Sequence, residues 1–121
     1  MKRVLLAEDE EVLRMLIIDS LEDTDIAIDE AADGLEAYQC FERNEYDLLM
    51  VDYMMPGMTG IEVIRKVREH PTKHDVAILM LTAKSQQKDE ELAKEAGADY
   101  FLAKPFSPVK LIELVEEILR V

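Results

Sequence analysis

Short apolar segments alternate along the chain with longer segments whose apolar residues recur at helical spacing. The apolar segments are 4–7, 26–28, 48–51, 76–81 and 100–103. Runs of this length are typical of strands, and the uninterrupted runs at 48–51 and 76–81 are typical of strands covered on both faces. Helical spacing and capping residues predict helices through 12–21, from Asp33 through 41, at 61–69 and 87–96, and from Ser107 through 119.

This alternation of five strands with five helices predicts an α/β fold. Crossovers of helix length imply a parallel sheet with right-handed connections and helices on both faces. We therefore expect a doubly wound sheet with strand order 2-1-3-4-5, in a three-layer α/β/α arrangement of the flavodoxin-like kind. The weak strand at 26–28 is expected at an edge. No linker or repeat interrupts the pattern, so residues 1–121 are expected to form one domain.

The strand that ends at Asp52 gives the first indication of chemistry. Residues 48–51 have no polar side chain, Asp52 follows at once, and Pro56-Gly57 marks a turn. Thr59 and Glu62 have the spacing of a capping box that opens the next helix. Ligands in open α/β sheets bind beyond the carboxyl ends of the strands, which makes Asp52 a candidate functional residue. Asp is also common in turns for structural reasons alone.

Polar residues follow three further strands. Glu8 and Asp9 come after the first strand, Thr82 after the fourth and Lys104 after the fifth. In a parallel sheet these ends share one edge with Asp52. Three carboxylates at one place repel unless a cation joins them, and Mg²⁺ takes carboxylate, water and phosphate oxygens as ligands. A lysine and a hydroxyl group beside such a metal indicate a phosphate group, to which both donate hydrogen bonds.

A purely structural account of the same residues is the alternative. Asp9 could cap the first helix, Lys104 could neutralise Asp52, and Thr82 could serve strand propensity. That account needs several independent coincidences, whereas clustering at the point where the strand order reverses is typical of ligand sites.

The composition limits which cellular compartment and which classes of binding partner are expected. Lys and Arg number 14 and Asp and Glu 27, a net charge of −13 that disfavours direct nucleic-acid binding and favours metal ions and basic partners. No apolar run approaches the roughly 20 residues of a membrane span. The single cysteine, Cys40, excludes an internal disulfide, fits a reducing cytoplasm and is expected to be buried on a helix. His70 and His74 flank a Pro-containing loop and are expected to be exposed and without a chemical role.

The motifs together resemble the receiver domain of two-component response regulators, of the chemotaxis-regulator-like kind. The resemblance rests on Glu8-Asp9, residues 52–60 (DYMMPGMTG), Thr82-Ala83 and Lys104-Pro105-Phe106, and it spans the whole chain in order and with the expected spacings. It implies one receiver domain over residues 1–121, acting as a cytoplasmic phosphorelay switch.

The resemblance also implies a set of metal ligands. Asp52 is the expected phosphoryl acceptor, and it shares Mg²⁺ (or Mn²⁺) with Asp9 and the backbone carbonyl of Met54. Glu8 is expected to help hold the metal through water. The only chemistry such a domain catalyses is its own phosphotransfer and dephosphorylation, so it is not an enzyme in the usual sense.

The same resemblance implies roles for residues near the ends of the fourth and fifth strands. Thr82 and Lys104 are expected to bind the phosphoryl oxygens, and Thr82 and Phe101 to form the conformational switch. The Lys104-Pro105 peptide is expected to be cis. Tyr100 stands where one DNA-binding subfamily has a second acid after Gly-Ala-Asp, which disfavours that subfamily's salt-bridged dimer.

The implied partners are a histidine kinase or phosphotransfer protein and a downstream protein or effector domain, with a phosphorylation-dependent homodimer as a further option. The sequence alone leaves three alternative functions open. They are a small-molecule or flavin-binding module on the same fold, an Mg²⁺-dependent phosphatase of free substrates, and a receiver that binds proteins without phosphorylation. The acidic turn after the first strand would repel a flavin phosphate.

Overall fold

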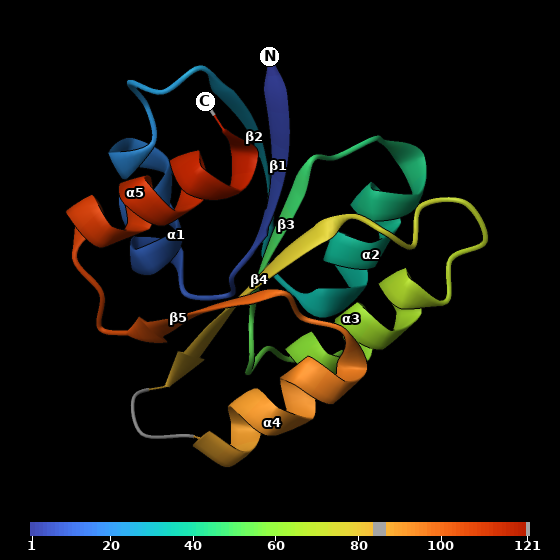
Figure 1. The fold of residues 1–121 in the computed structure, drawn as a ribbon. Helices are drawn as coiled ribbons and strands as arrows, with labels where there is room; N and C mark the ends of the chain where they lie inside the picture. The colour runs from blue at the N-terminus through green and yellow to red at the C-terminus, as the bar shows by residue number, and fades with distance from the viewer. Residues whose placement is uncertain (84–86, 121) are drawn as a thin grey trace.

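A five-stranded parallel sheet forms the centre of the computed structural model, which describes residues 1–83 and 87–120. Within those residues the strands are β1 (Lys2–Ala7), β2 (Ile26–Ala31), β3 (Leu48–Asp52), β4 (Ala77–Ala83) and β5 (Tyr100–Lys104). The helices are α1 (Glu11–Ser20), α2 (Gly34–Arg43), α3 (Gly60–Arg68), α4 (Gln87–Ala96) and α5 (Pro108–Leu119). The strand order is β2-β1-β3-β4-β5, which confirms the predicted doubly wound, flavodoxin-like fold (Figure 1).

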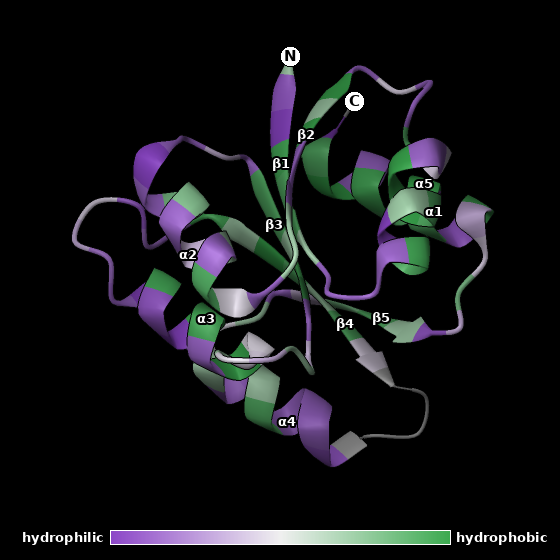
Figure 2. Cartoon of the chain, turned by 180° about the vertical axis from the view of Figure 1, so that it is seen from behind, coloured by the Kyte–Doolittle hydropathy of each residue, from purple (hydrophilic) through white to green (hydrophobic). Residues whose placement is uncertain are grey.

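The helices lie in two layers, with α1 and α5 on one face of the sheet and α2, α3 and α4 on the other (Figure 1). Successive strand residues point to opposite faces, so each strand serves both layers. In β1, Leu5 and Ala7 pack in the core on the side of α2 and α3, whereas Val4 and Leu6 pack against α1 and α5. Figure 2 shows the result as apolar central strands beneath helices that are apolar on one side and polar on the other.

Burial falls from the centre of the sheet to its edges. All five residues of β3 are buried, as its uninterrupted apolar run predicts. Most residues of β2 are only half-buried, which confirms the predicted edge position of this strand. The described residues contain no helix that is both long enough and apolar enough to span a bilayer.

Local capping residues start the helices. The predicted capping box of α3 is present, with the Glu62 N–H donating to Thr59 Oγ1 at 3.3 Å and the Thr59 N–H donating to Glu62 Oε1 at 3.2 Å. Asp33 accepts from the Glu36 N–H at 2.8 Å, but the Glu36 carboxylate reaches the N–H of Ala32 instead of the capping residue. Gly97, with φ 122°, follows α4 as predicted for its C-terminal cap.

The strands extend beyond the apolar segments that predicted them, as β2 and β4 show. β2 continues to Ala31 because β1 pairs with it as far as Ala7↔Ala31. β4 includes Thr82 and Ala83 because β5 pairs with it to its last residue. Pairing with a neighbouring strand extends the sheet over polar residues. The hydrophobic pattern of a single segment cannot predict that pairing.

The apolar stripe predicted for the first helix is only partly buried. Ile17 and Leu21 lie in the core, whereas Val12 is 76% exposed and Leu16 is 44% exposed. Only the side of α1 that faces α5 and the sheet can exclude water, so the stripe is wider than the contact available to it.

His70 differs from the prediction of an exposed and idle side chain. It is half-buried, its ring packs edge-on against Phe41 at 5.7 Å, and Nδ1 accepts from the N–H groups of Thr72 (3.2 Å) and Lys73 (3.1 Å). The turn at Pro71 folds those N–H groups back onto the ring, which gives His70 a structural role. His74 is exposed as predicted, and Cys40 on α2 is half-buried rather than fully buried.

Gly60 is expected to be hard to replace. A methyl group here would overlap the carbonyl oxygen of Asp52 and lie 2.9 Å from Met80 Cε. Gly60→Ala should therefore lower the free energy of unfolding by about 2 kcal/mol, as overpacking does. Gly57→Ala is the control, because Gly57 has φ 78° but none of the described residues has an atom within 4 Å of the added carbon, so backbone strain of about 1 kcal/mol is the expected cost. Urea unfolding measures both, and a Gly60→Ala protein as stable as wild type would contradict the close approach.

Candidate functional site

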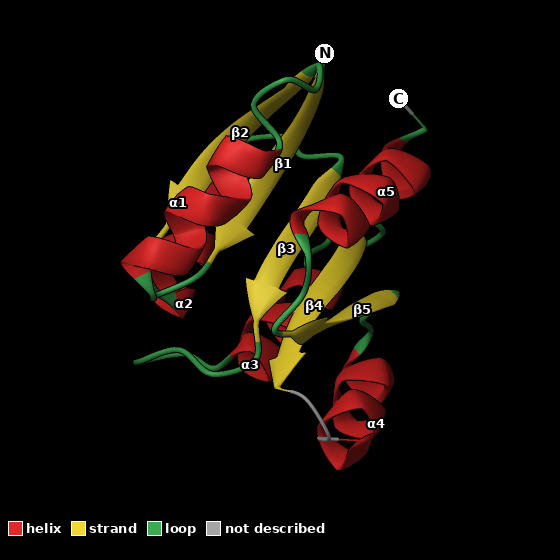
Figure 3. Cartoon of the chain, turned by 90° about the vertical axis from the view of Figure 1, so that its left-hand side faces the viewer, coloured by secondary structure: helices red, strands yellow, loops and turns green. Residues whose placement is uncertain are grey.

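Three carboxylates meet at the carboxyl edge of the sheet, where the arrowheads of β3 and β4 lie together (Figure 3). Glu8 and Asp9 follow β1, and Asp52 is the last residue of β3, which pairs with β1. One oxygen from each of the three lies within 4.8 Å of the others. Glu8 is fully buried, Asp52 is 6% exposed, and Asp9 is exposed. The structure therefore brings together the three acids that the sequence placed at neighbouring strand ends.

Lys104 lies against two of these acids. Its Nζ is 2.9 Å from Asp52 Oδ1 and 3.0 Å from Glu8 Oε1. It is the last residue of β5, and its side chain crosses the end of β4 to reach them. The Lys104-Pro105 peptide bond is cis. The lysine neutralises part of a negative charge that the fold itself concentrates.

Burial and charge shift the protonation of the buried members of the cluster. Burial raises the pKa of Glu8 to about 7, although bonds from the Glu10 N–H and Lys104 oppose the rise. Burial also raises the pKa of Asp52, with Lys104 opposing and the charge of Asp9 adding to the effect. For Lys104, burial alone would lower the pKa, but its bonds to Asp52 and Glu8 raise it overall. The lysine therefore stays charged while Glu8 titrates near neutral pH.

The turn after β1 carries Asp9 and is tied on both sides of it. The Glu10 N–H donates to Glu8 Oε2 at 3.0 Å, and Arg14 Nη1 donates to the Glu8 carbonyl at 2.7 Å. The N-cap of α1 is Glu10, without a side-chain cap bond, so Asp9 does not occupy the helix-capping position of the structural alternative. The contact between Arg14 and the Glu8 carbonyl was not predicted, because the position of Arg14 in the sequence does not show which backbone group its side chain contacts.

The hydroxyl group of Thr82 is a candidate for binding a polar ligand. Thr82 lies in β4, between the strands that carry Asp52 and Lys104, and is 1% exposed. Its Oγ1 is buried and has no hydrogen-bond partner in the described part of the chain. A buried hydroxyl group without a partner costs free energy, and at a strand end beside a carboxylate cluster it fits an absent polar ligand.

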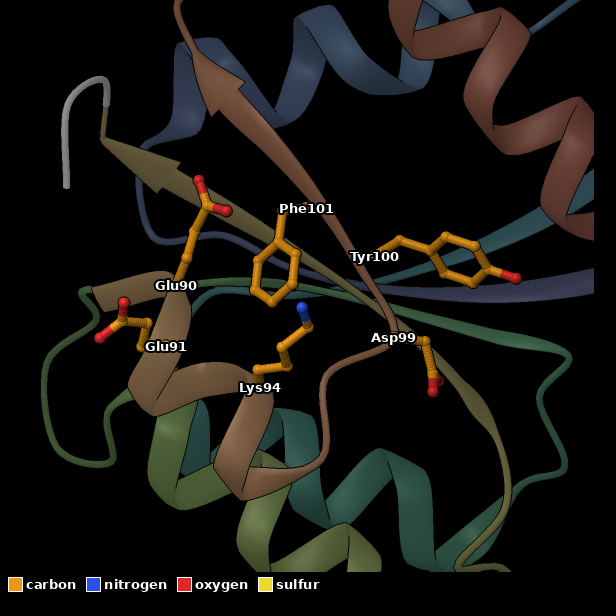
Figure 4. Close-up of a pocket in the computed structure, with 6 residues that line it drawn as sticks. All are labelled: Glu90, Glu91, Lys94, Asp99, Tyr100 and Phe101. Atoms are coloured by element: carbon orange, nitrogen blue, oxygen red, sulfur yellow. The ribbon is translucent and has the colours of Figure 1, made fainter. Parts of the chain in front are cut away.

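Two further residues of the predicted site are Met54 and Phe101. Met54, two residues after Asp52, has a side chain that is 64% exposed. Phe101 on β5 is half-buried and lines a pocket of about 450 Å³ beside α4, together with Lys94 and Tyr100. Figure 4 shows the Phe101 ring and the Lys94 side chain lying toward one another, while Tyr100 points away. Phe101 thus lies on the α4 side of the sheet.

Comparison with known proteins identifies the family. The sequence model of the response regulator receiver domain matches residues 4–116. The chain belongs to this family. Its role in two-component signalling, which the resemblance implied, is thereby confirmed, and the flavin-binding alternative is not favoured.

Relatives and solved structures agree with this assignment. The chain is 42% identical over 118 residues to the transcriptional regulatory protein ResD of Bacillus subtilis, covering 98% of this chain and 48% of ResD. It is 38% identical over 117 residues to SrrA of Staphylococcus aureus, covering 97% and 47%. The chain therefore spans about half the length of these transcriptional regulatory proteins.

Two solved structures are similar along almost the whole chain. A putative response regulator from Chloroflexus aurantiacus has a TM-score of 0.93 and 33% identity, covering 99% of this chain and 98% of that one. The receiver domain of the sensor histidine kinase PA1611 from Pseudomonas aeruginosa has a TM-score of 0.89 and 30% identity, with the same coverage. The latter holds a magnesium ion coordinated in its active-site cleft.

Glu8 gives this receiver domain a predicted pH dependence. Its pKa is raised from an ordinary 4.5 to about 7, so between these values the folded state holds a proton that the unfolded state releases. The stabilisation is complete below pH 4.5 and is lost as pH rises through 7, a change of about 3 kcal/mol. Urea unfolding of metal-free protein from pH 4.5 to 8 should show this decline in wild type and a shallower one in Glu8→Gln. Parallel curves would refute the assignment.

Proposed function

We propose that this receiver domain is an Mg²⁺-dependent switch that accepts a phosphoryl group on Asp52. The observation that supports it most is the position of Asp52, within 4.8 Å of Glu8 and Asp9 and bonded to Lys104. A nucleophilic carboxylate, a site for a divalent cation and a fixed positive charge meet there. These are the parts that phosphoryl transfer needs, since its catalysis is mainly positioning and charge neutralisation.

The donor set fits Mg²⁺, or Mn²⁺ in its place. Asp9 and Asp52 supply hard carboxylate oxygens, the backbone carbonyl of Met54 is the third proposed ligand, and Glu8 assists through water. When bound, the metal neutralises the carboxylates and polarises a phosphoryl oxygen. Asp9, the exposed acid of the three, stands where a hydrated ion would first make contact.

Asp52 performs the covalent step. One of its carboxylate oxygens attacks the phosphorus atom of a phosphohistidine on the partner, so that a P–O bond forms as the P–N bond breaks. The bonding electron pair leaves with the imidazole nitrogen. Lys104, already 2.9 Å from Asp52, stays close enough to donate to a phosphoryl oxygen in the product.

Thr82 and Phe101 connect the phosphoryl group to the rest of the molecule. The Thr82 hydroxyl, which lacks a partner in the described residues, gains one when a phosphoryl oxygen is present. Movement of β4 at Thr82 is then transmitted to neighbouring β5, where Phe101 borders the pocket beside α4. Phosphorylation is proposed to change this face.

The proposed biological setting is the cytoplasm, with residues 1–121 acting as one domain. A histidine kinase or phosphotransfer protein donates the phosphoryl group, and a downstream protein or effector domain responds. The net charge of −13 favours a protein partner over direct contact with nucleic acid. Catalysis is limited to the domain's own phosphotransfer and dephosphorylation, and a phosphorylation-dependent homodimer stays a prediction.

Acetyl phosphate with Mg²⁺ should add one phosphoryl group, at Asp52. Asp52→Asn should abolish the mass increase, because an amide oxygen is a poor nucleophile for phosphorus. Intact mass spectrometry with site mapping measures both. Asp47→Asn is the matched control, an acid just before β3 rather than at its end, and it should label fully. Full labelling of Asp52→Asn at another carboxylate would contradict the proposal.

Mg²⁺ should stabilise the fold. Repulsion among the three acids acts mainly on the folded state, where a cation binds them, and a ligand at a hundredfold excess over Kd adds about 2.7 kcal/mol. That corresponds to a rise in Tm of roughly 10 °C for a domain of this size. Asp9→Asn should raise the metal-free Tm and weaken the response to Mg²⁺.

General screening of the net charge must be separated from this effect, so NaCl at matched ionic strength is the control. If Mg²⁺ raises Tm no more than NaCl does, or if Asp9→Asn keeps the full response to Mg²⁺, the proposed metal site is wrong.

A further inference from the structure

We propose that Arg14 is a positioning residue that holds Asp9 in place for the metal. This inference rests on the proposed function, since it concerns the same Mg²⁺ site. It arises from a half-buried arginine on α1 that lies beside the site without belonging to its three carboxylates or its lysine.

The turn that carries Asp9 is tied on both sides. Before Asp9, the carbonyl of Glu8 accepts a bond of 2.7 Å from Arg14 Nη1. After Asp9, the N–H of Glu10 donates to Glu8 Oε2 at 3.0 Å. The Asp9 side chain itself is exposed, so the backbone on either side of it sets where its carboxylate lies.

Arg14 can serve this role because it is itself held. Its Nε donates to Glu30 Oε1 at 3.1 Å, on the neighbouring strand β2, and its side chain is only 16% exposed. Its backbone N–H donates to the Glu10 carbonyl at 2.9 Å, which places it in the first turn of the helix that leaves the loop. A guanidinium group is planar and rigid, so one bond to Glu30 fixes the direction of the other toward Glu8.

The sign of the effect on metal affinity separates positioning from charge. If Arg14 acted only through its positive charge, its removal would strengthen Mg²⁺ binding, because cations repel each other. If it positions Asp9, its removal weakens binding, since outer partners of metal ligands typically contribute 10–100-fold in affinity. If it only supports the fold, the metal-free Tm falls while the affinity stays the same.

The experiment is calorimetric titration of the whole chain with MgCl₂ for wild type, Arg14→Met, Arg14→Lys and Arg3→Met. Arg14→Met should bind Mg²⁺ about tenfold more weakly. Arg14→Lys should fall between it and wild type, because an ammonium group keeps the charge but not the two-bond geometry. Arg3→Met is the matched control. It removes a different arginine pair to β2, the 2.7 Å Arg3–Asp29 contact that starts from β1, and should keep wild-type affinity.

A metal-free measurement tests the same idea independently. In EDTA, the amide of Glu10 should exchange its hydrogen faster in Arg14→Met than in Arg3→Met, because the turn is no longer tied at Glu8. Thermal unfolding in the same buffer shows how much of any change is general loss of stability.

The outcomes are distinct. Equal or tighter Mg²⁺ binding by Arg14→Met overturns the inference, as does an equal loss of affinity in Arg3→Met. If Arg14→Met does not fold, Arg14→Lys decides, and wild-type affinity in that variant overturns it. A wild-type chain that binds no Mg²⁺ overturns the proposed function itself.

Discussion

Electrostatic repulsion at the carboxyl edge of the sheet is the constraint on which the site depends. The strand order places β1 beside β3, and their ends force Glu8, Asp9 and Asp52 within 4.8 Å of one another. The structure offsets the repulsion in two ways. Lys104 bonds to the two buried acids, and Asp9 stays in contact with water, where charge interactions are weakest. These two features reduce the destabilising repulsion among the carboxylates, and the carboxylates still offer a site for a cation.

The site has a rigid half and an adjustable half. Asp52 and Lys104 are the last residues of strands, and parallel pairing fixes their backbones, with Asp52 opposite Leu81 and Lys104 opposite Ala83. Asp9 lies on a turn whose position depends on side-chain bonds such as that from Arg14. A ligand on a strand end is held by the whole sheet, whereas one on a turn is only as well placed as its supporting bonds.

Features that depend on local pattern were predictable from the sequence. The uninterrupted apolar run before Asp52 predicted a buried central strand, and the spacing of Thr59 and Glu62 predicted a capping box; both are present. Features that depend on distant partners were not predictable. The length of β2 follows from pairing with β1, the burial of His70 follows from packing on Phe41, and the reach of Arg14 follows from Glu30. The gathering of the acids was predictable from topology, and the pairing of Lys104 with Asp52 was anticipated, but the second contact of Lys104, with Glu8, was not.

The Thr82 hydroxyl has a consequence for protein engineering. Valine has nearly the same shape as threonine and would remove a buried polar atom that has no partner in the described residues. A redesign guided by folding stability alone would therefore favour valine here and delete a hydroxyl group that none of the described residues binds. The threonine marks a position where selection for a durable scaffold and selection for a responsive one favour different side chains.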